Sequence, residues 1–202
     1  MLLSNYKDWP EVGIDEAGRG CLAGPVFASA VLFPPDYHNK WLNDSKKLSV
    51  RQRDYLKKII EKDAISLAVG IADHHEIDAV NILQATYLSM HRALDQIRHD
   101  FNHIIVDGNR FKPYKNYNYT CLVKGDAKFL SIAAASIIAK SARDEYMEKI
   151  HDEFPEYGWK INKGYPTKKH REAIRISGVS PYHRKSFTLL PVIQPTLFDG
   201  KS

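Results

Sequence analysis

Two adjacent acidic residues between two apolar segments constrain the fold of this 202-residue chain more than any other feature. They lie in the motif Gly13-Ile14-Asp15-Glu16-Ala17-Gly18-Arg19-Gly20, which continues an apolar segment that ends at Ile14. The next apolar segment, Val26 to Phe33, begins after a Gly24-Pro25 turn. Both segments have the composition of buried strands, so we expect the two acids to follow directly on a strand of the core.

The order of these residues also predicts a break in the strand. Neighbouring side chains on a regular strand point to opposite faces, so Asp15 and Glu16 can share a site only where the pleat is interrupted. The glycines after them would supply that interruption. Paired carboxylates beside a glycine turn suit hard divalent cations, which prefer oxygen ligands. The alternative is a surface turn with two solvated acids, and the apolar flanking segments count against it.

Composition limits the class of protein. Hydrophobic residues make up 44% and charged residues 26% of the chain, which is typical of one globular domain. The net charge of +5 permits a polyanionic partner. Two cysteines without paired spacing indicate a reducing compartment and no disulfide framework. We find no signal peptide and no apolar stretch long enough for a membrane span, and we expect a cytoplasmic monomer.

Apolar periodicity and capping residues predict the order of the elements. Ser49 and Thr167 are expected N-caps. We expect strands at 26–33, 66–72, 103–107 and 121–123, and helices at about 50–62, 73–98, 128–154 and 168–177.

Two further acids follow apolar segments. Asp107 ends the segment His103-Ile104-Ile105-Val106, and ligands gather at the carboxyl ends of strands. Asp126 follows Cys121 to Val123 and precedes a helix with unusually small residues in its first turns. Asp126 could instead only cap that helix. Because Asp126 is at the third position in the chain where an acid follows an apolar segment, we assign it to the same site as Asp15 and Asp107.

Several other polar residues have weaker functional interpretations. His74 and His75 lack a chelating partner, so we expect them in solvent at the start of a helix. The tyrosines of the segment 110–119 could stack on nucleotides, but a packed loop is the more ordinary interpretation. Lys46 and Lys47 precede the first helix and could contact phosphate as readily as solvent. Tyr165 lies between glycine and proline, and we expect it to be exposed on a stiff turn.

These acids together indicate a metal-dependent chemistry. Asp15, Glu16, Asp107 and Asp126 would repel one another strongly if they converged without cations. Two divalent ions would remove that repulsion and could hold a phosphodiester and activate water for its hydrolysis. The chain has no Walker-type loop, no Gly-x-Ser-x-Gly elbow and no cysteine nucleophile signature.

The chain resembles the type 2 ribonucleases H (ribonuclease HII) from about Val12 to Ser177. The first strand is expected near the start of the chain, which favours type 2 over type 3 enzymes with their extra N-terminal domain. The motifs that carry the resemblance are the Gly13–Gly20 segment, Asp44-Ser45-Lys46-Lys47-Leu48, Val106-Asp107-Gly108-Asn109, Lys124-Gly125-Asp126, Ala133-Ala134-Ala135-Ser136-Ile137 with Ala139-Lys140, and Gly164-Tyr165-Pro166-Thr167.

The resemblance implies an α/β, RNase H-like fold with a mixed central β-sheet, flanking α-helices and a small C-terminal helical part. We expect residues 1–190 to form the catalytic domain and residues 191–202 a tail. The implied activity is cleavage of the RNA strand of RNA–DNA hybrids and cleavage 5′ of single ribonucleotides in duplex DNA. This would leave 3′-hydroxyl and 5′-phosphate ends during RNA primer removal and ribonucleotide excision repair.

The resemblance also implies a role for individual residues. Asp15, Glu16, Asp107 and Asp126 would bind two Mg²⁺ or Mn²⁺ ions. Gly18, Arg19 and Gly20 would contact the ribose 2′-hydroxyl, which separates RNA from DNA. Tyr165 would stack on the sugar of the next deoxynucleotide and sense the RNA–DNA junction. Lys46, Lys47 and Asn109 are further candidates for substrate binding.

The tail Gln194-Pro195-Thr196-Leu197-Phe198 is similar to the Gln-x-x-Leu-Phe pattern with which bacterial repair proteins bind a sliding clamp. Gln194, Leu197 and Phe198 are therefore candidate partner-binding residues. A tail with no partner is the alternative, because such short patterns arise by chance.

Two other functions are alternatives to this one. Junction resolvases and 3′ exonucleases with a similar fold also use strand-end acids, but the Gly-Arg-Gly turn and Tyr165 have no obvious task in them. A hybrid-binding module without catalysis would have no use for four converging carboxylates, because bare acids repel phosphate.

Overall fold

The computed structural model describes residues 2–42 and 48–191. Lys46, Lys47 and the candidate clamp-binding residues Gln194, Leu197 and Phe198 lie outside this range. The elements are β1 (Glu11–Ala17), β2 (Val26–Leu32), α1 (Val50–Asp63), β3 (Ser66–Ala72), α2 (His74–Leu94), β4 (His103–Asp107), β5 (Asn118–Leu122), η2 (Gly125–Ala127), α3 (Leu130–Glu153), η3 (Pro155–Tyr157), α4 (Trp159–Asn162) and α5 (Lys168–Ser177).

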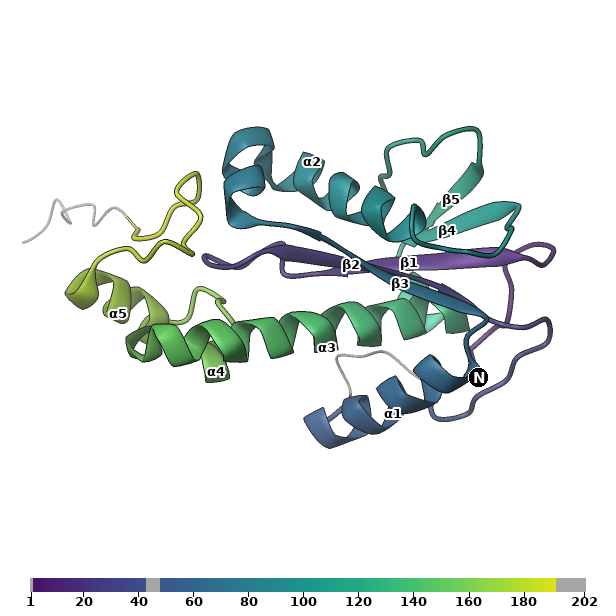
Figure 1. Cartoon of the computed structure of the whole chain (residues 1–202), viewed down its shortest axis with the longest axis horizontal. Helices are drawn as coiled ribbons and strands as arrows, with labels where there is room; N and C mark the ends of the chain where they lie inside the picture. The colour runs from purple at the N-terminus through teal and green to yellow at the C-terminus, as the bar shows by residue number, and fades with distance from the viewer. Residues whose placement is uncertain (1, 43–47, 192–202) are drawn as a thin grey trace, which may run out of the picture.

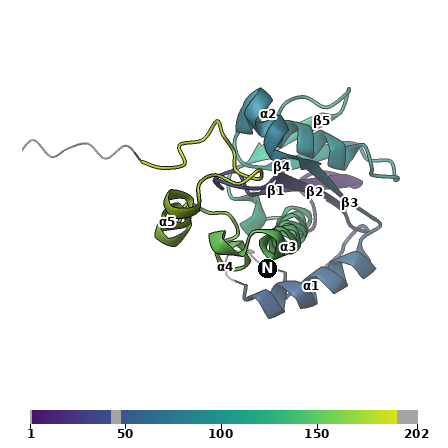
Figure 2. The ribbon, with the colours of Figure 1, turned by 60° about the vertical axis from the view of Figure 1, so that its left-hand side comes forward.

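The expected mixed sheet is confirmed, and its strands follow the order β3-β2-β1-β4-β5. β1 pairs antiparallel with β2 and parallel with β4, while β4 and β5 are parallel. Figure 1 shows α2 over one face of this sheet and α3 over the other, with α1 beneath α3. The same layers are visible in Figure 2, and helices therefore cover the central strands of the sheet on both sides.

The long helix α3 lies close against the central strand because small residues face each other there. Ala133, Ala134 and Ala135 are fully buried. A Cβ atom at Gly13 of β1 would come within 2.4 Å of the Ser131 carbonyl carbon, so only glycine allows this approach. These small residues therefore allow α3 to pack directly against β1.

Helix α2 confirms its predicted start but differs in its course. Asp73 caps the helix and forms a capping box with Glu76. Asn81 has a φ of 68° and a ψ of 163°, which kinks a helix that we had predicted to be continuous. Val80, an apolar residue beside this kink, is 42% exposed. His74, predicted in solvent, is buried and packs against Tyr182 with ring centroids 5.6 Å apart.

Helix α1 is held against α3 by charged contacts. Ser49 is the N-cap as predicted, and its capping box with Gln52 fixes the first turn. Arg53 Nη2 donates a hydrogen bond of 2.9 Å to Asp144 Oδ2 of α3. This contact places one buried basic residue, Arg53, in the packing of the two helices.

The strand β5 begins earlier than predicted. Asn118, Tyr119 and Thr120 pair in parallel with His103, Ile104 and Ile105 of β4. Their polar composition suggested a loop, but an edge strand has one face and one edge in solvent and tolerates such residues. Tyr114 is buried in the core, which supports the packed-loop interpretation of that residue.

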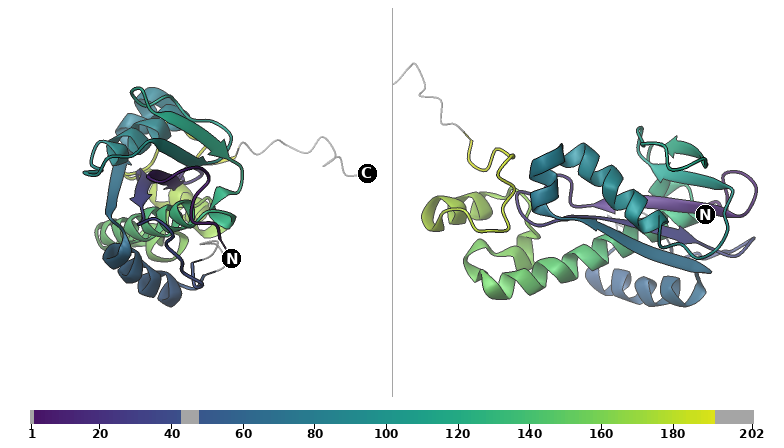
Figure 3. Two further views of the ribbon diagram at one scale, coloured as in Figure 1. Left: turned by 90° about the vertical axis from the view of Figure 1, so that its right-hand side faces the viewer. Right: turned by 45° about the horizontal axis from the view of Figure 1, so that its top comes forward.

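The C-terminal helical part lies beyond one end of the sheet, as the right-hand view of Figure 3 shows. Thr167 caps α5 as predicted, with its hydroxyl accepting from the N–H of His170. Trp159, Met147 and Ile174 form a separate small core with Leu22 of the glycine-rich loop. In the described ranges, no helix has both the length and the apolar character that crossing a bilayer requires.

Candidate active site

Most of the predicted site residues that the structure describes gather around a pocket of about 270 Å³ at the end of β1. Carboxylates, glycine-loop residues and the predicted junction-sensing tyrosine all reach it. Its lining residues are Asp15, Glu16, Ala17, Gly18, Arg19, Gly20, Asp107, Ser136, Lys140 and Tyr165.

The prediction that the pleat is interrupted after Asp15 is wrong. β1 continues through Ala17, and Asp15 and Glu16 pair in regular register with Ser29 and Ala28 of β2. Both acids nevertheless reach the pocket because the pairing of β1 with β4 ends at Ile14. Past Ile14, β1 is paired only with β2. The edge of β1 that would face β4 is open there, and this leaves space for the side chains of Asp15 and Glu16 at the pocket.

Asp107 lies at the end of the neighbouring parallel strand, where β4 leaves its pairing with β1. The backbone N–H of Gly125 donates a 2.7 Å hydrogen bond to Asp107 Oδ1. A Cβ atom at Gly125 would lie 2.6 Å from Ile132 Cδ1, so a larger residue here would displace the Ile132 side chain. Two parallel strands and the loop after β5 thus fix the second acidic position.

Asp126 is placed differently from its prediction. β5 ends at Leu122, and Asp126 lies in the short helix η2 after Lys124, which has a left-handed φ of 57°. The capping interpretation is wrong, because the N-cap of α3 is Phe129. Asp126 is 3% exposed and is not among the pocket-lining residues. Its neighbour Gly125 connects it to Asp107 through the hydrogen bond described above.

The acids at the pocket influence each other electrostatically. Burial raises the pKa of Asp15 well above its usual value, and the negative charges of Glu16 and Asp107 raise it further. Hydrogen bonds from the Ser136 side chain and the Glu16 N–H lower this pKa, but they do not cancel the effect. Arg19 Nη1 lies 3.2 Å from Glu16 Oε1 and partly balances the charge of Glu16.

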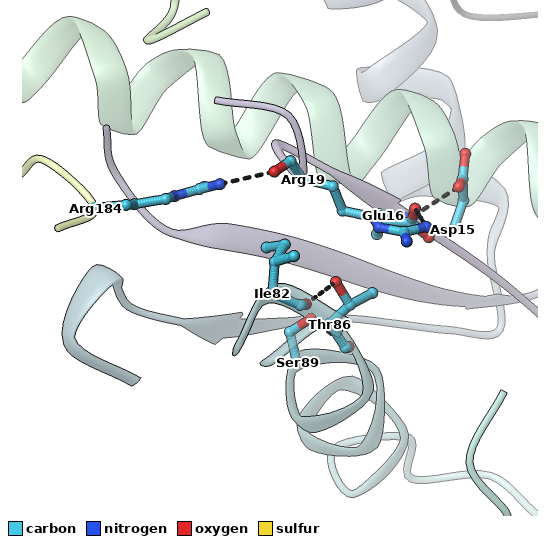
Figure 4. A network of polar contacts seen from close by, with 7 residues as sticks. All are labelled: Asp15, Glu16, Arg19, Ile82, Thr86, Ser89 and Arg184. Atoms are coloured by element: carbon cyan, nitrogen blue, oxygen red, sulfur yellow. Dashed lines mark hydrogen bonds and ion pairs between the residues drawn. The ribbon is translucent and has the colours of Figure 1, made fainter. Parts of the chain in front are cut away.

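The glycine-rich loop between β1 and β2 is fixed from behind by a buried arginine. Arg184 is fully buried and donates hydrogen bonds to the carbonyl oxygens of Gly18 (2.7 Å), Arg19 (2.9 Å) and Gly24 (2.9 Å). Figure 4 shows Arg184 reaching the backbone of Arg19, while the Arg19 side chain extends towards Glu16 and Asp15. The carbonyl groups of the loop therefore face the protein interior at these positions.

A second buried arginine, Arg143 of α3, connects this loop to the turn that carries Tyr165. Its guanidinium donates to the carbonyl oxygens of Ala23 (3.2 Å) and Lys163 (2.8 Å) and lies 6.0 Å from the Tyr165 ring centroid. Gly18 has a φ of +99°, and a Cβ atom there would lie 2.0 Å from Arg143 Nε. Gly18 is therefore required by the protein's own packing.

Gly20 differs from Gly18 in this respect. A Cβ atom at Gly20 would meet no atom within 4 Å. Internal packing therefore does not require glycine at this position, which faces open space beside the pocket.

Tyr165 is 42% exposed, in agreement with the expected stiff and open turn. Lys163 and Gly164 precede it with left-handed φ values of 49° and 82°. Burial raises the pKa of the Tyr165 hydroxyl, which also forms a side-chain hydrogen bond with Cys21. The tyrosine thus contacts the residue that directly follows Gly18-Arg19-Gly20.

No functional role was predicted for Ser136, Lys140 or Arg143, although all three lie on the face of α3 turned to the site. Ser136 and Lys140 line the pocket, and burial lowers the pKa of Lys140. Their spacing of four and then three residues is the spacing of one helix face, and this was the signal available in the sequence. Asn109 lies in an adjacent small cavity that also borders Glu16, Arg19 and Asp107.

The chemistry of these side chains fits a divalent cation. Asp15, Glu16 and Asp107 offer only oxygen ligands, which Mg²⁺ and Mn²⁺ prefer. Within residues 2–42 and 48–191, no three His, Cys, Asp or Glu side chains already form a finished metal-binding group. The metal ligands remain a prediction that rests on the type and burial of the donors.

Comparison with known proteins gives a consistent family. A family model described as ribonuclease HII matches residues 12–190. The chain is 60% identical over 179 residues to a ribonuclease HII from Christiangramia forsetii, covering 89% of this chain and 90% of that protein.

Solved structures of two further proteins have a similar fold. A complex of PCNA and RNase HII from Archaeoglobus fulgidus aligns at a TM-score of 0.73 and 25% identity, covering 94% of this chain and 99% of that chain. Bst-RNase HIII in complex with Mn²⁺ aligns at a TM-score of 0.74 and 20% identity, covering 89% and 67%.

Proposed function

Because the chain belongs to the ribonuclease HII family, whose members are hydrolytic nucleases that act on RNA–DNA hybrids, we propose that it also cuts duplex DNA at single embedded ribonucleotides. Cleavage occurs on the 5′ side of the ribonucleotide and leaves 3′-hydroxyl and 5′-phosphate ends. The observation that carries the proposal is that Asp15, Glu16 and Asp107 share one pocket with Gly18–Gly20 and Tyr165.

The carboxylates hold the catalytic cations. Asp15, Glu16 and Asp107, which line the pocket, would hold them together with Asp126, which lies in η2 beside Asp107. When bound, the two ions activate water and neutralise charge on the scissile phosphate. The raised pKa of Asp15 supports this role, because a cation would offset the repulsion from Glu16 and Asp107 that contributes to the shift. The Mn²⁺ complex of Bst-RNase HIII, which has a similar fold, makes Mn²⁺ a reasonable alternative to Mg²⁺.

The glycine-rich loop recognises the ribose. Its carbonyl groups at Gly18 and Arg19 are bound by Arg184. The loop therefore presents a fixed backbone to the pocket, and the open space at Gly20 lets a sugar edge approach it. The 2′-hydroxyl is the one group that distinguishes a ribonucleotide at that position.

Tyr165 and nearby polar residues complete substrate binding. Tyr165 stacks on the deoxyribose that follows the ribonucleotide, and its exposed ring at the pocket supports that role. Lys140 at the pocket contributes positive charge that attracts the phosphates. Asn109 binds the substrate from the adjacent cavity. Lys46 and Lys47 are proposed as phosphate contacts from the sequence motif alone.

A paired substrate assay separates this function from its rivals. Two DNA duplexes that differ by one 2′-hydroxyl are incubated with Mg²⁺, with and without EDTA. We expect cleavage only of the ribonucleotide duplex and only with Mg²⁺. Cleavage of both duplexes would favour another two-metal nuclease, and binding without turnover would favour a hybrid-binding module.

The role of Tyr165 has its own test. Tyr165→Ala should reduce kcat/KM more on a single embedded ribonucleotide than on a long RNA–DNA hybrid, because only the first substrate presents the junction at every cut. Equal losses on both substrates would remove the proposed role.

We further propose that the tail contacts a sliding clamp during RNA primer removal and ribonucleotide excision repair. Support comes from the Gln194, Leu197 and Phe198 pattern and from the Archaeoglobus fulgidus RNase HII, whose structure contains PCNA. The double variant Leu197→Ala/Phe198→Ala should bind the clamp more weakly while hybrid cleavage without the clamp is unchanged. Unaltered clamp affinity would reject this contact.

A further inference from the structure

A buried chain of polar side chains runs from the C-terminal segment to the backbone of Tyr165. It connects Ser180, His183, His170 and Trp159 and ends at the Tyr165 carbonyl oxygen. His170, His183 and Trp159 are all 0% exposed. Buried polar groups of this kind must satisfy each other, so the donor at each step can be worked out.

The first end of the chain fixes the tautomer of His183. The Ser180 backbone N–H donates a 3.0 Å hydrogen bond to His183 Nδ1, and an N–H group cannot accept one in return. His183 Nδ1 is therefore unprotonated, and the neutral ring carries its proton on Nε2. His183 Nε2 lies 3.2 Å from His170 Nε2, so the His183 Nε2–H donates a hydrogen bond to His170 Nε2.

The other contacts fix His170 in the same way. Trp159 Nε1–H, which can only donate, lies 3.0 Å from His170 Nε2. His170 Nε2 is therefore an acceptor, and the ring carries its proton on Nδ1. That nitrogen lies 2.9 Å from the Tyr165 carbonyl oxygen, which can only accept. Both ends of the chain lead independently to the same assignment.

This contact acts on the backbone that aims the Tyr165 ring. The Tyr165 carbonyl also accepts from the Thr167 N–H at 2.8 Å, and the Tyr165 N–H donates to the Asn162 carbonyl at 2.8 Å. Both peptide groups that flank Tyr165 are thus held, which restricts its φ and ψ and so the direction of its Cα–Cβ bond. His170 supplies the side-chain part of this restraint, from the third residue of α5.

We propose that His170 is a positioning residue that aims Tyr165 at the pocket through the hydrogen bond from its Nδ1–H to the Tyr165 carbonyl. The proposal rests on the proposed role of Tyr165 at the RNA–DNA junction. His183 and Trp159 act behind His170 by holding its ring in the tautomer that donates to Tyr165. The lowered pKa values of both buried histidines, caused mainly by their burial, agree with neutral rings at neutral pH.

Two substitutions at His170 separate positioning from general support of the fold. Asparagine can place its amide N–H₂ near the position of Nδ1, and it keeps the donor to Tyr165. Glutamine can place its amide oxygen near the position of Nε2, and it keeps the acceptor for Trp159 and His183 but loses the donor to Tyr165. Each variant thus retains one half of the network.

The readout is the ratio of kcat/KM on a DNA duplex with one ribonucleotide to kcat/KM on a long RNA–DNA hybrid. For His170→Gln we expect this ratio to fall about fivefold, the net effect of one lost hydrogen bond. For His170→Asn we expect a ratio within about twofold of wild type. A purely structural role would lower both kcat/KM values by one common factor and leave the ratio unchanged. An unchanged ratio in His170→Gln, or equal falls in both variants, would overturn the proposal.

A second measurement judges the geometry without any cleavage. Imidazole ¹⁵N NMR of the wild-type protein at neutral pH should show His170 protonated on Nδ1 and His183 protonated on Nε2. The opposite tautomer at His170 would overturn the proposal, because that ring could not donate to Tyr165. If the wild type fails to cut at single ribonucleotides, the proposed function fails, while the NMR result still decides the His170 contact.

Discussion

Arg184 Nη2 donates a hydrogen bond of 2.7 Å to the carbonyl oxygen of Gly18, a residue 166 positions earlier in the chain. The same guanidinium binds the carbonyl groups of Arg19, Gly24 and Pro25. One buried side chain from the C-terminal segment therefore holds both ends of the loop that is proposed to recognise ribose. The C-terminal part is in this way a structural component of the active site.

Substitution Arg184→Lys should lower kcat/KM on a single-ribonucleotide duplex by at least about tenfold, because one ammonium group cannot bond four carbonyl groups held in a fork geometry. Arg171→Lys is the matched control, since Arg171 also donates to backbone carbonyl groups, those of Thr188 and Leu189, but outside the loop. Cleavage rates and thermal unfolding of both variants provide the comparison. Equal activity in the two variants would contradict the proposed function of Arg184.

Gly20→Ala should leave thermal stability unchanged, because a Cβ atom there meets no protein atom within 4 Å. The same methyl group should reduce kcat/KM on ribonucleotide duplexes by about tenfold or more, since it occupies the space in which the sugar is expected. Gly18→Ala, where the Cβ atom would collide with Arg143, should instead lose both stability and activity. A fully active Gly20→Ala enzyme would show that the ribose does not approach the loop at this position.

Asp15→Asn should reduce cleavage at least about 100-fold while binding of the hybrid largely survives. The same change should raise the melting temperature of the metal-free protein at neutral pH by roughly a few degrees. The sign follows from the raised pKa of Asp15: its ionised form costs stability above its ordinary pKa of 3.8, and no cost remains below it. Melting curves in EDTA at neutral and acidic pH check this, and a lower melting temperature for Asp15→Asn at neutral pH would speak against it.

The pH dependence of stability should reveal the buried histidine chain. Burial, followed by the proximity of His170, lowers the pKa of His183 from 6.5 to about 4. The unfolded chain therefore takes up a proton that the folded chain refuses between these two values, so stability is lost as the pH falls from 6.5 to about 4. His183→Asn keeps an acceptor for Ser180 but does not titrate, and its unfolding free energy should fall less steeply over this range. Parallel pH profiles would show that His183 is not a buried neutral group.

Much of the fold could be predicted because its signals are local. Apolar segments at β1, β2 and β4, and the caps Ser49 and Thr167, are contained in a few neighbouring residues. The kink at Asn81 could not be predicted in this way, because a left-handed asparagine leaves no periodic signal. β5 was placed too late because its first residues are polar, as the edge of a sheet allows.

The residues of the candidate site also fall into those with a local sequence signal and those without one. Asp15, Glu16 and Asp107 could be predicted to converge because each comes after apolar residues at the carboxyl end of a strand and because β1 and β4 run in parallel. The network around Arg184, Arg143 and His170 could not, because its members are joined only by the tertiary fold. Nothing in the local sequence distinguishes a buried arginine such as Arg184 from an exposed one.

The central claim, that these carboxylates bind divalent cations, is tested most directly by titrating Mn²⁺ into the protein and following free Mn²⁺ by electron paramagnetic resonance. We expect saturable binding that Mg²⁺ competes away, weakened at least about tenfold in Asp15→Asn and Asp107→Asn. Asp152→Asn, at an exposed position near the end of α3, should bind as the wild type does. Equal Mn²⁺ affinity in all four proteins would contradict the account.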